Sequence, residues 1–397
     1  MRTTLLPALV LAVLLGIAGN ATAQPSPWQP ERTTAGWVFT PGVSLGGLWD
    51  SNTTLVVKGG EQLKEWVGLV NPRGEIGFNG QHTHFDIGYS GSLEAYQTLN
   101  ELTRYDQLGR LSLRHQASPR LAFTGTSSIN LTPTTERLQI ASVPFENVGS
   151  TLIDNTAGGT YALSQRTSIS GSYNLEWISF DRQPTSLSTL QGGHSHTVLG
   201  TVTHAISSRA SIGGSYSFEH ANTGGGFQIV NVQDAIGTIT YQFAAHTSVM
   251  GGAGLAQLNL PQIGEVQRGP SLHARLTHEF NRTQVEVTYD RSFVPSWNFG
   301  GTSTNEELRT SAFFPITNRL SVNLGVSYSR NDPIISSGDL LGLNSWWTSS
   351  SVGYAAARWL RIEGFFNGSF QDSTARGEVN RRRIGIQIVT SKPVRIQ

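Results

Sequence analysis

Residues 168–177 read Ser-Ile-Ser-Gly-Ser-Tyr-Asn-Leu-Glu-Trp, and apolar side chains alternate with polar ones along them. Successive side chains of a β-strand point to opposite faces, so this segment has one apolar face and one polar face. The same alternation recurs in about 18 segments from residue 36 to the end of the chain. Such a series favours an all-β fold, a transmembrane antiparallel up-and-down β-barrel with lipid outside and water inside.

The start of the chain predicts a secretory signal peptide over residues 1–23. Leu5 to Ala18 form an apolar stretch, and Ala21-Thr22-Ala23 has the small residues of a cleavage site. Residues 24–35 are then a periplasmic amino-terminal segment, and residues 36–397 form a single barrel in the outer membrane of a Gram-negative bacterium. The chain has no cysteine, which suits an oxidising periplasm and excludes a disulfide framework.

Composition excludes several other classes of protein. Arg2 is the charged residue of the leader, so cleavage lowers Lys plus Arg from 28 to 27 and balances the 27 Asp plus Glu. A net charge of zero gives no reason to expect nucleic-acid binding. Charged residues are only 14 % of the chain, fewer than a typical soluble surface carries. No run of about 18 apolar residues follows the leader, so membrane-spanning helices are not expected.

The gaps between the alternating segments are short and long in turn. Short periplasmic turns, long external loops and an even strand number are typical of bacterial outer-membrane barrels. Gaps after the odd segments are the longer ones, with residues 51–65 and 132–151 among the largest. The expected strands are 36–50, 66–79, 82–97, 103–116, 119–131, 152–164, 166–181, 193–206, 208–222, 228–243, 246–258, 267–280, 282–294, 304–315, 317–331, 344–357, 358–372 and 376–390.

A basic residue recurs just after the short turns, three positions before an apolar residue. A spacing of about 36 to 46 residues between copies corresponds to one long hairpin per repeat. A cation beside a tight turn can lie at headgroup level, where a long side chain reaches water. The copies begin at Arg120, Arg166, Arg209, Arg282 and Arg319, with Arg358 and His246 in looser versions.

Aromatic residues gather near both ends of the expected strands, as two girdles at the membrane interfaces should. The girdle near the long loops is expected to contain Trp49, Trp177, Phe293, Trp297, Trp346 and Trp347. The girdle near the short turns is expected to contain Trp37, Tyr161, Tyr241, Phe280, Phe313 and Trp359.

If the apolar faces meet lipid, the opposite faces line the lumen and carry the charged residues of the strands. A basic residue against lipid at mid-membrane costs roughly 2–4 kcal/mol, whereas in an aqueous lumen it costs little. Barrels of about 16 to 18 strands leave an aqueous channel. The pore-lining candidates are Asp86, Glu94, Glu176, Glu219, Arg275, Glu279, Glu286, Asp290, Arg361 and Glu363.

The loop at residues 132–151 is the longest external loop and the third in order. It carries Glu136, Arg137 and Glu146, and two prolines stiffen it. A long third loop often folds into the channel of porins, so these three residues are candidates for a constriction.

Other motifs lack the context that their chemistry needs. Gly42-Val-Ser-Leu-Gly46 has the spacing of a serine-hydrolase motif, but it lies within a strand with no helix after it. The pairs His82/His84 and His194/His196 have no evident third metal ligand. The sequence therefore predicts neither catalytic residues, nor a metal site, nor a cofactor.

Several stretches resemble a family of Gram-negative outer-membrane β-barrel proteins associated with exopolysaccharide biosynthesis operons. They are Val70-Asn-Pro-Arg-Gly-Glu-Ile76, Phe85-Asp-Ile-Gly-Tyr89, Leu111-Ser-Leu-Arg-His115 with Arg120-Leu121, Phe39-Thr-Pro-Gly42 and Trp49-Asp-Ser-Asn52. The resemblance implies a porin-like conduit, with exopolysaccharide export as one role and no catalytic residues.

Together these patterns predict an outer-membrane channel or conduit in contact with lipid, through which small hydrophilic solutes or polysaccharide pass. One alternative is a structural or adhesive barrel with a plugged lumen, which binds a partner through its external loops. A weaker alternative is an outer-membrane hydrolase. The pattern says nothing of the oligomeric state.

Overall fold

The computed structural model describes residues 35–98, 103–140, 142–181, 190–224, 228–280, 282–297, 302–334, 342–373 and 377–396. Within these ranges no helix is long and apolar enough to cross a membrane. The strands are β1 (Gly36–Asp50), β2 (Glu65–Asn79), β3 (Thr83–Tyr96), β4 (Arg104–Ser118), β5 (Leu121–Thr132), β6 (Ser150–Ala162), β7 (Thr167–Phe180), β8 (Gly193–Ala205), β9 (Ala210–Thr223), β10 (Gln228–Ala244), β11 (Thr247–Leu260), β12 (Glu265–Phe280), β13 (Thr283–Pro295), β14 (Thr302–Pro315), β15 (Leu320–Pro333), β16 (Leu343–Ala357), β17 (Leu360–Ser373), β18 (Gly377–Ser391) and β19 (Val394–Ile396), with a 3-10 turn, η2 (Thr135–Leu138), between β5 and β6.

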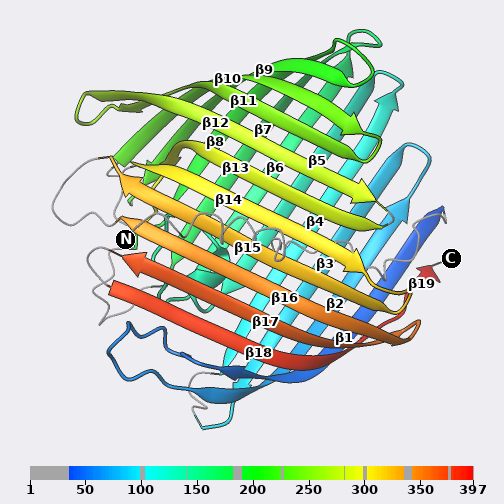
Figure 1. Cartoon of the computed structure of the whole chain (residues 1–397), viewed down its shortest axis with the longest axis vertical. Coiled ribbons are helices and arrows are strands. Elements are labelled where there is room, and N and C mark those ends of the chain that lie inside the picture. The colour runs from blue at the N-terminus through cyan, green and yellow to red at the C-terminus, as the bar shows by residue number, and fades with distance from the viewer. Residues whose placement is uncertain are drawn as a thin grey trace.

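The strands form a closed antiparallel barrel. Each strand from β1 to β17 pairs with the next one in the chain, and β18 closes the ring on β1, from Gly42↔Ser391 to Asp50↔Arg383. Figure 1 shows the tilted strands, with short turns at one end of the barrel and long loops at the other. The short β19 pairs with the start of β1.

Repeated hydroxyl-capped turns close the barrel at the short-turn end. Ser118 Oγ accepts hydrogen bonds from the N–H groups of Arg120 and Leu121, at 3.3 and 3.1 Å. A Ser or Thr hydroxyl that bonds the backbone two and three residues ahead stabilises a tight turn. The same turn recurs at Ser164, Ser207 and Thr317, each two residues before an arginine. The arginine repeat of the sequence is therefore part of a repeated turn.

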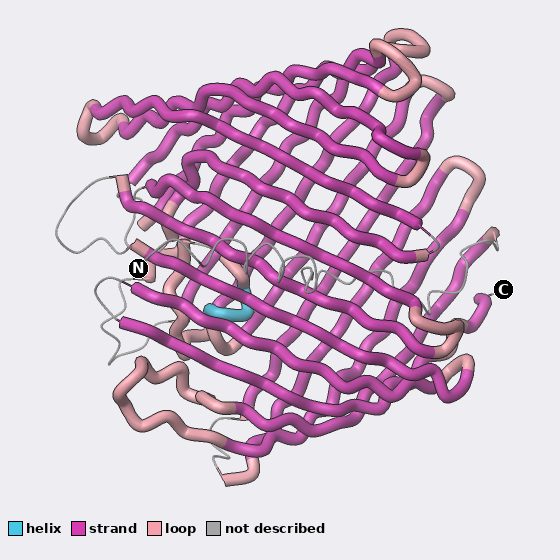
Figure 2. Tube along the Cα trace, viewed as in Figure 1, coloured by secondary structure: helices cyan, strands magenta, loops and turns pink. Residues whose placement is uncertain are grey.

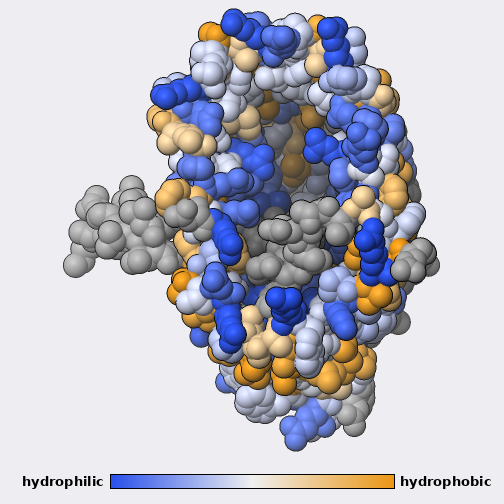
Figure 3. Space-filling model, turned by 90° about the vertical axis from the view of Figure 1, so that its right-hand side faces the viewer, coloured by the Kyte–Doolittle hydropathy of each residue, from blue (hydrophilic) through white to orange (hydrophobic). Residues whose placement is uncertain are grey.

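The outer face of the barrel is apolar over its middle. Tyr173, Val198 and Phe218 lie side by side on β7, β8 and β9 and are exposed, and Val198 has 55 % of its surface uncovered. Ile212 and Ile239 form a similar exposed pair on β9 and β10. Figure 3 views the short-turn end and shows hydrophilic side chains around a central hollow, with hydrophobic ones on the outer flanks.

All 18 strands expected from the sequence are present, and their observed ends lie within a few residues of the expected ones. The segments expected to be a leader and periplasmic extension, residues 1–23 and 24–35, lie outside the described residues except for Ala35.

Three residues expected in the outer girdle near the long loops lie inside the barrel instead. Phe293, Trp297 and Trp347 are buried, whereas Trp177 and Trp346 are exposed as expected. Trp347 follows Trp346 on a strand and so takes the opposite face. Phe293 and Trp297 point inward because the chain at the end of β13 bends into the lumen.

Candidate functional site

The loop between β5 and β6 folds into the lumen and reaches the opposite wall. We call its described part, residues 133–140 and 142–149, the inner loop; Figure 2 shows it with η2 within the outline of the barrel. Trp347 Nε1 on β16 donates a 3.1 Å hydrogen bond to the carbonyl of Glu136. The N–H of Phe145 donates a 2.7 Å bond to Gln371 Oε1 on β17. These bonds fix the inner loop across the lumen.

Buried ion pairs attach the same loop to the closing strands. Arg381 of β18 donates to both carboxylate oxygens of Asp50, from Nη2 to Oδ2 at 2.6 Å and from Nε to Oδ1 at 3.1 Å, and it also bonds Glu136. Arg381 and Asp50 are 1 % and 0 % exposed. A buried guanidinium between two carboxylates is stable only because every charge has a partner. Arg381 therefore acts as a clamp between β1, β18 and the inner loop.

A second network lies beside the first. Arg137 of the inner loop donates to Glu94 of β3 at 2.7 Å and forms an ion pair with Asp106 of β4. Arg383 of β18 also bonds Glu94. Burial disfavours the charged form of Arg137, but the two carboxylates outweigh burial and raise its pKa above the ordinary arginine value. Arg137 is thus charged at any physiological pH.

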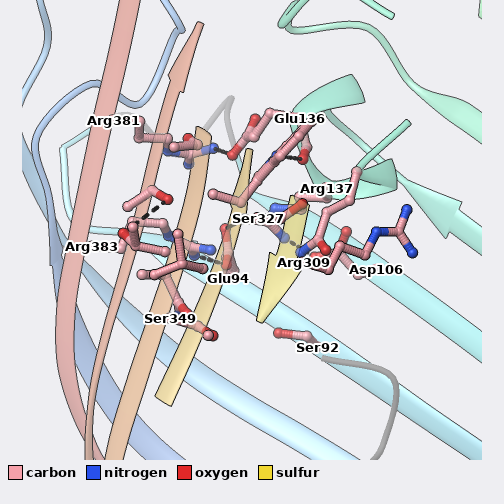
Figure 4. Close-up of a pocket in the computed structure, with 18 residues that line it drawn as sticks. Ser92, Glu94, Asp106, Glu136, Arg137, Arg309, Ser327, Ser349, Arg381 and Arg383 are labelled. Atoms are coloured by element: carbon pink, nitrogen blue, oxygen red, sulfur yellow. Dashed lines mark hydrogen bonds and ion pairs between the residues drawn. The ribbon is translucent and has the colours of Figure 1, made fainter. Parts of the chain in front are cut away.

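A cavity of about 340 Å³ lies between these networks and the wall of β14 to β17. The inner loop gives Glu136, Arg137 and Gln139 to its lining, while Arg309 enters from the facing wall (Figure 4). Hydroxyl and amide groups complete the wall, at Ser92, Ser327, Thr348, Ser349, Asn367 and Ser369. The site holds both signs of charge and many hydrogen-bonding groups, which suits small hydrophilic solutes.

A second inward element, residues 292–297, was not expected from the sequence. β13 is paired with β12 only as far as Leu272↔Arg291. Beyond that point residues 292–295 leave β12 but stay paired with β14, from Ser292↔Asn305 to Pro295↔Thr302, and lie against the inner face of the wall. The N–H of Gln191, before β8, donates a 3.2 Å hydrogen bond to the carbonyl of Trp297. We call residues 292–297 the inward segment.

The lumen wall beneath the inward segment is apolar. Phe293 packs against Val232 and Leu258, which are almost fully buried on β10 and β11. Asp234 Oδ2 accepts a 2.6 Å bond from Ser271 of β12 and a 3.4 Å bond from Ser292 of β13. This carboxylate therefore holds together the two strands where their backbone pairing ends.

The two inward elements also touch each other. Ser142 Oγ of the inner loop donates a 3.3 Å hydrogen bond to the carbonyl of Pro295. Leu138, Val143, Ile178 and Trp297 form one buried apolar cluster between the inner loop, β7 and the inward segment. The inner loop and the inward segment thus contact each other inside the long-loop half of the barrel.

The ten pore-lining candidates all lie on strand positions that alternate with outward apolar residues. The structure brings only Glu94 among them to the cavity, beside Glu136 and Arg137. Glu146 lies further along the inner loop, near Leu55 and Val379. The others are distributed along the lumen: Asp86 near Ser112, Glu176 near Trp297, Glu219 near Ser195, Arg275 paired with Glu286, Asp290 with His273, Arg361 with Ser321 and Glu363, and Glu279 at the short-turn end.

Sequence reasoning missed five charged residues of the site. They are Asp50, Asp106, Arg309, Arg381 and Arg383. The alternation rule could have found four of them, because Asp50, Asp106, Arg309 and Arg383 stand next to the outward residues Trp49, Tyr105, Leu308 and Ile384. Arg381 has no apolar neighbour in the sequence, but it lies two residues before Arg383 and so shares its face.

The outer surface of the barrel indicates that the molecule lies in a membrane. A closed ring of paired strands leaves no unsatisfied sheet edge in hydrocarbon, and its apolar middle band matches the lipid interior. Exposed Trp66 and Trp177 near the long loops, and Trp37 and Trp359 near the short turns, mark the two interfaces. The chain is an outer-membrane β-barrel.

Known proteins show only weak similarity to this chain. No protein-family model matches the chain, and none of the curated proteins does. Among solved structures, Acinetobacter baumannii OccAB4 is 6 % identical, with a TM-score of 0.47 over 92 % of this chain and 100 % of that one. Pseudomonas aeruginosa OpdQ is 9 % identical, with a TM-score of 0.43 over 90 % of this chain and 98 % of that one. Similarity at this level assigns no function to the chain.

Proposed function

We propose that the barrel is an outer-membrane channel for small hydrophilic solutes, narrowed by the inner loop and the inward segment. The observation that carries this proposal is the open, charged cavity between the inner loop and the wall of β14 to β17. Paired charges that line a narrow aqueous path admit polar solutes and exclude apolar ones of similar size. The ion-paired loop sets the width of that path.

Polysaccharide export, which the family resemblance implies, is not part of this proposal. A polymer of sugars needs a continuous wide path, whereas the inner loop extends from β5 to contacts on β16, β17 and β18. The comparisons add no support for polysaccharide as the transported solute.

A plugged barrel that binds a partner through its external loops is the second candidate. The buried cluster of Leu138, Val143, Ile178 and Trp297 favours it, because such packing holds the inner loop firmly in the lumen. A barrel of this kind would pass no solute. A hydrolase has no such observation in its favour, since Ser44 lies within β1 and its hydroxyl accepts a bond from Asn71.

Solute entry into proteoliposomes distinguishes these two candidates. Purified protein in liposomes is expected to let a pentose enter rapidly and a tetrasaccharide hardly at all, because the cavity is smaller than the larger sugar. Osmotic swelling measures both rates, and heat-unfolded protein is the control. Exclusion of the pentose as well would support the plugged barrel, and equal entry of both sugars would contradict a narrow constriction.

A further inference from the structure

In each of the eight short turns, a basic residue stands one or two positions before the first residue of the next strand. The hydroxyl-capped turns use only the backbone of this residue, because Ser118 bonds the N–H of Arg120 and not its side chain. The turn itself therefore does not require a cation. The eight residues are His82, Arg120, Arg166, Arg209, His246, Arg282, Arg319 and Arg358.

Backbone bonds place most of these residues in equivalent positions around the rim. The carbonyl of Arg120 accepts a 2.8 Å bond from the N–H of Ala162, at the end of the neighbouring strand β6. The same bond recurs at His82, Arg166, Arg209, His246 and Arg319, to Gln116, Ala205, Gln242, Glu279 and Ala355. These residues thus belong to the strand ladder, so their facing follows from alternation.

Alternation turns the side chains of these six residues toward the mouth of the lumen rather than toward lipid, whereas Arg358, four residues before the outward Ile362, takes the other face. Arg120 lies one residue before Leu121 and three before Phe123, and Phe123 is exposed on the outer face. Arg209 likewise lies three residues before the outward Ile212. Arg319 has the same relation to Val322. A cation that anchored the barrel to lipid would occupy the other face.

The described residues provide no ion-pair partner for the side chains of this ring. All eight side chains are exposed. Among the described residues none of the eight forms an ion pair, although the long-loop half holds several. One acidic residue, Glu279, lies next to the ring, because its N–H donates a hydrogen bond to the carbonyl of His246. The six arginines of the ring therefore outnumber the acidic residue beside it, and the described part of the short-turn mouth carries an excess of positive charge.

We infer that this ring, which we call the cationic collar, binds the carboxylate or phosphate groups of anionic solutes at the short-turn mouth of the channel. The inference rests on the proposed function, since solutes must reach that mouth. A ring of like charges around an opening raises the local concentration of counter-ions and speeds their entry. Guanidinium groups suit this role because they pair with carboxylate and phosphate through two parallel hydrogen bonds.

Equilibrium dialysis with tripolyphosphate tests the collar without requiring conduction. The collar variant replaces four residues, Arg120→Gln, Arg166→Gln, Arg209→Gln and Arg319→Gln. The control variant removes four exposed cations near the long loops, Lys64→Gln, Arg268→Gln, Arg330→Gln and Arg382→Gln. Folded, detergent-solubilised protein is expected to bind the probe about tenfold more weakly in the collar variant, and within about twofold of the unaltered protein in the control.

Salt and sidedness give two further readouts. Binding should be lost between 0.1 and 1 M salt, because the screening length falls from about 10 Å to about 3 Å. In planar bilayers, tripolyphosphate should block current from one chamber only, and the collar variant should escape block. The barrel could pass no current while the collar variant still loses tripolyphosphate binding. That result would support the cationic collar and contradict the proposed channel function.

Three results would overturn the collar. They are equal binding by the collar and control variants, binding that persists in 1 M salt, and retention of phosphatidylglycerol instead of tripolyphosphate. The last is measured by comparing bound lipid after purification from vesicles with and without phosphatidylglycerol. It would mean that the arginines hold lipid headgroups.

Discussion

Val198→Arg is expected to lower the free energy of unfolding by roughly 2–4 kcal/mol. Val198 lies in the middle of β8, is 55 % exposed, and has Tyr173 and Phe218 as its cross-strand neighbours on the same outer face. The guanidinium of an arginine there would face lipid and would lie between the two apolar side chains of Tyr173 and Phe218. Urea unfolding from detergent micelles, followed by tryptophan fluorescence, measures the change.

Ser217→Arg is the matched control. Ser217 is on the neighbouring strand but on the inner face, directly opposite Asp234 of β10. A cation there gains water and a carboxylate, so the unfolding free energy should change by less than about 1 kcal/mol. Equal losses from both variants would contradict the assignment of the outer and inner faces on β8 and β9.

Arg381→Met is expected to cost about 3–5 kcal/mol, because it removes the ion-pair partner of buried Glu136 and leaves buried Asp50 with only the 3.5 Å contact to Arg383. Asp50 and Glu136 are 0 % and 5 % exposed, and both bond this one guanidinium. The same change removes the clamp between β18 and the inner loop. Conductance should therefore rise and become noisier, as the loop moves in the lumen.

Two variants separate the clamp from a general effect on the strand. Arg382→Met removes the exposed neighbouring charge and should leave stability and conductance unchanged. The triple variant Asp50→Asn, Glu136→Gln, Arg381→Met removes every charge of the clamp, so it should regain most of the stability while keeping the raised conductance. An Arg381→Met protein as stable as the unaltered one would contradict the clamp.

The strand pattern was predictable because one physical rule decides it. In a barrel between lipid and water, every strand must be apolar on one face and tolerant of polar groups on the other. That requirement is local, so Ile169, Tyr173 and Trp177 mark the outer face without knowledge of their neighbours. The same rule extends to Arg383, which directly precedes the outward Ile384, and to Arg381, which lies two residues earlier on the same face.

The proposed constriction was only partly predictable because it depends on contacts between segments far apart in the chain. Pairing of Arg137 with Glu94 joins residues 43 positions apart, and Arg381 with Glu136 joins residues 245 apart. The bend at the end of β13 has a weaker signal. Pro270 and Pro295 lie on the two strands where pairing ends, and proline cannot donate a bond to a sheet ladder.

The single-channel conductance of a loop-shortened barrel tests the central claim, that the inner loop sets the width of an open channel. A short Gly-Ser linker in place of residues 136–146 removes the contacts to Trp347, Gln371 and Arg381. The control replaces residues 261–264, an exposed turn between β11 and β12, with the same linker. We expect steady currents from the unaltered protein, a severalfold larger conductance after shortening the inner loop, and no change in the control. Equal conductance in all three proteins would contradict the claim.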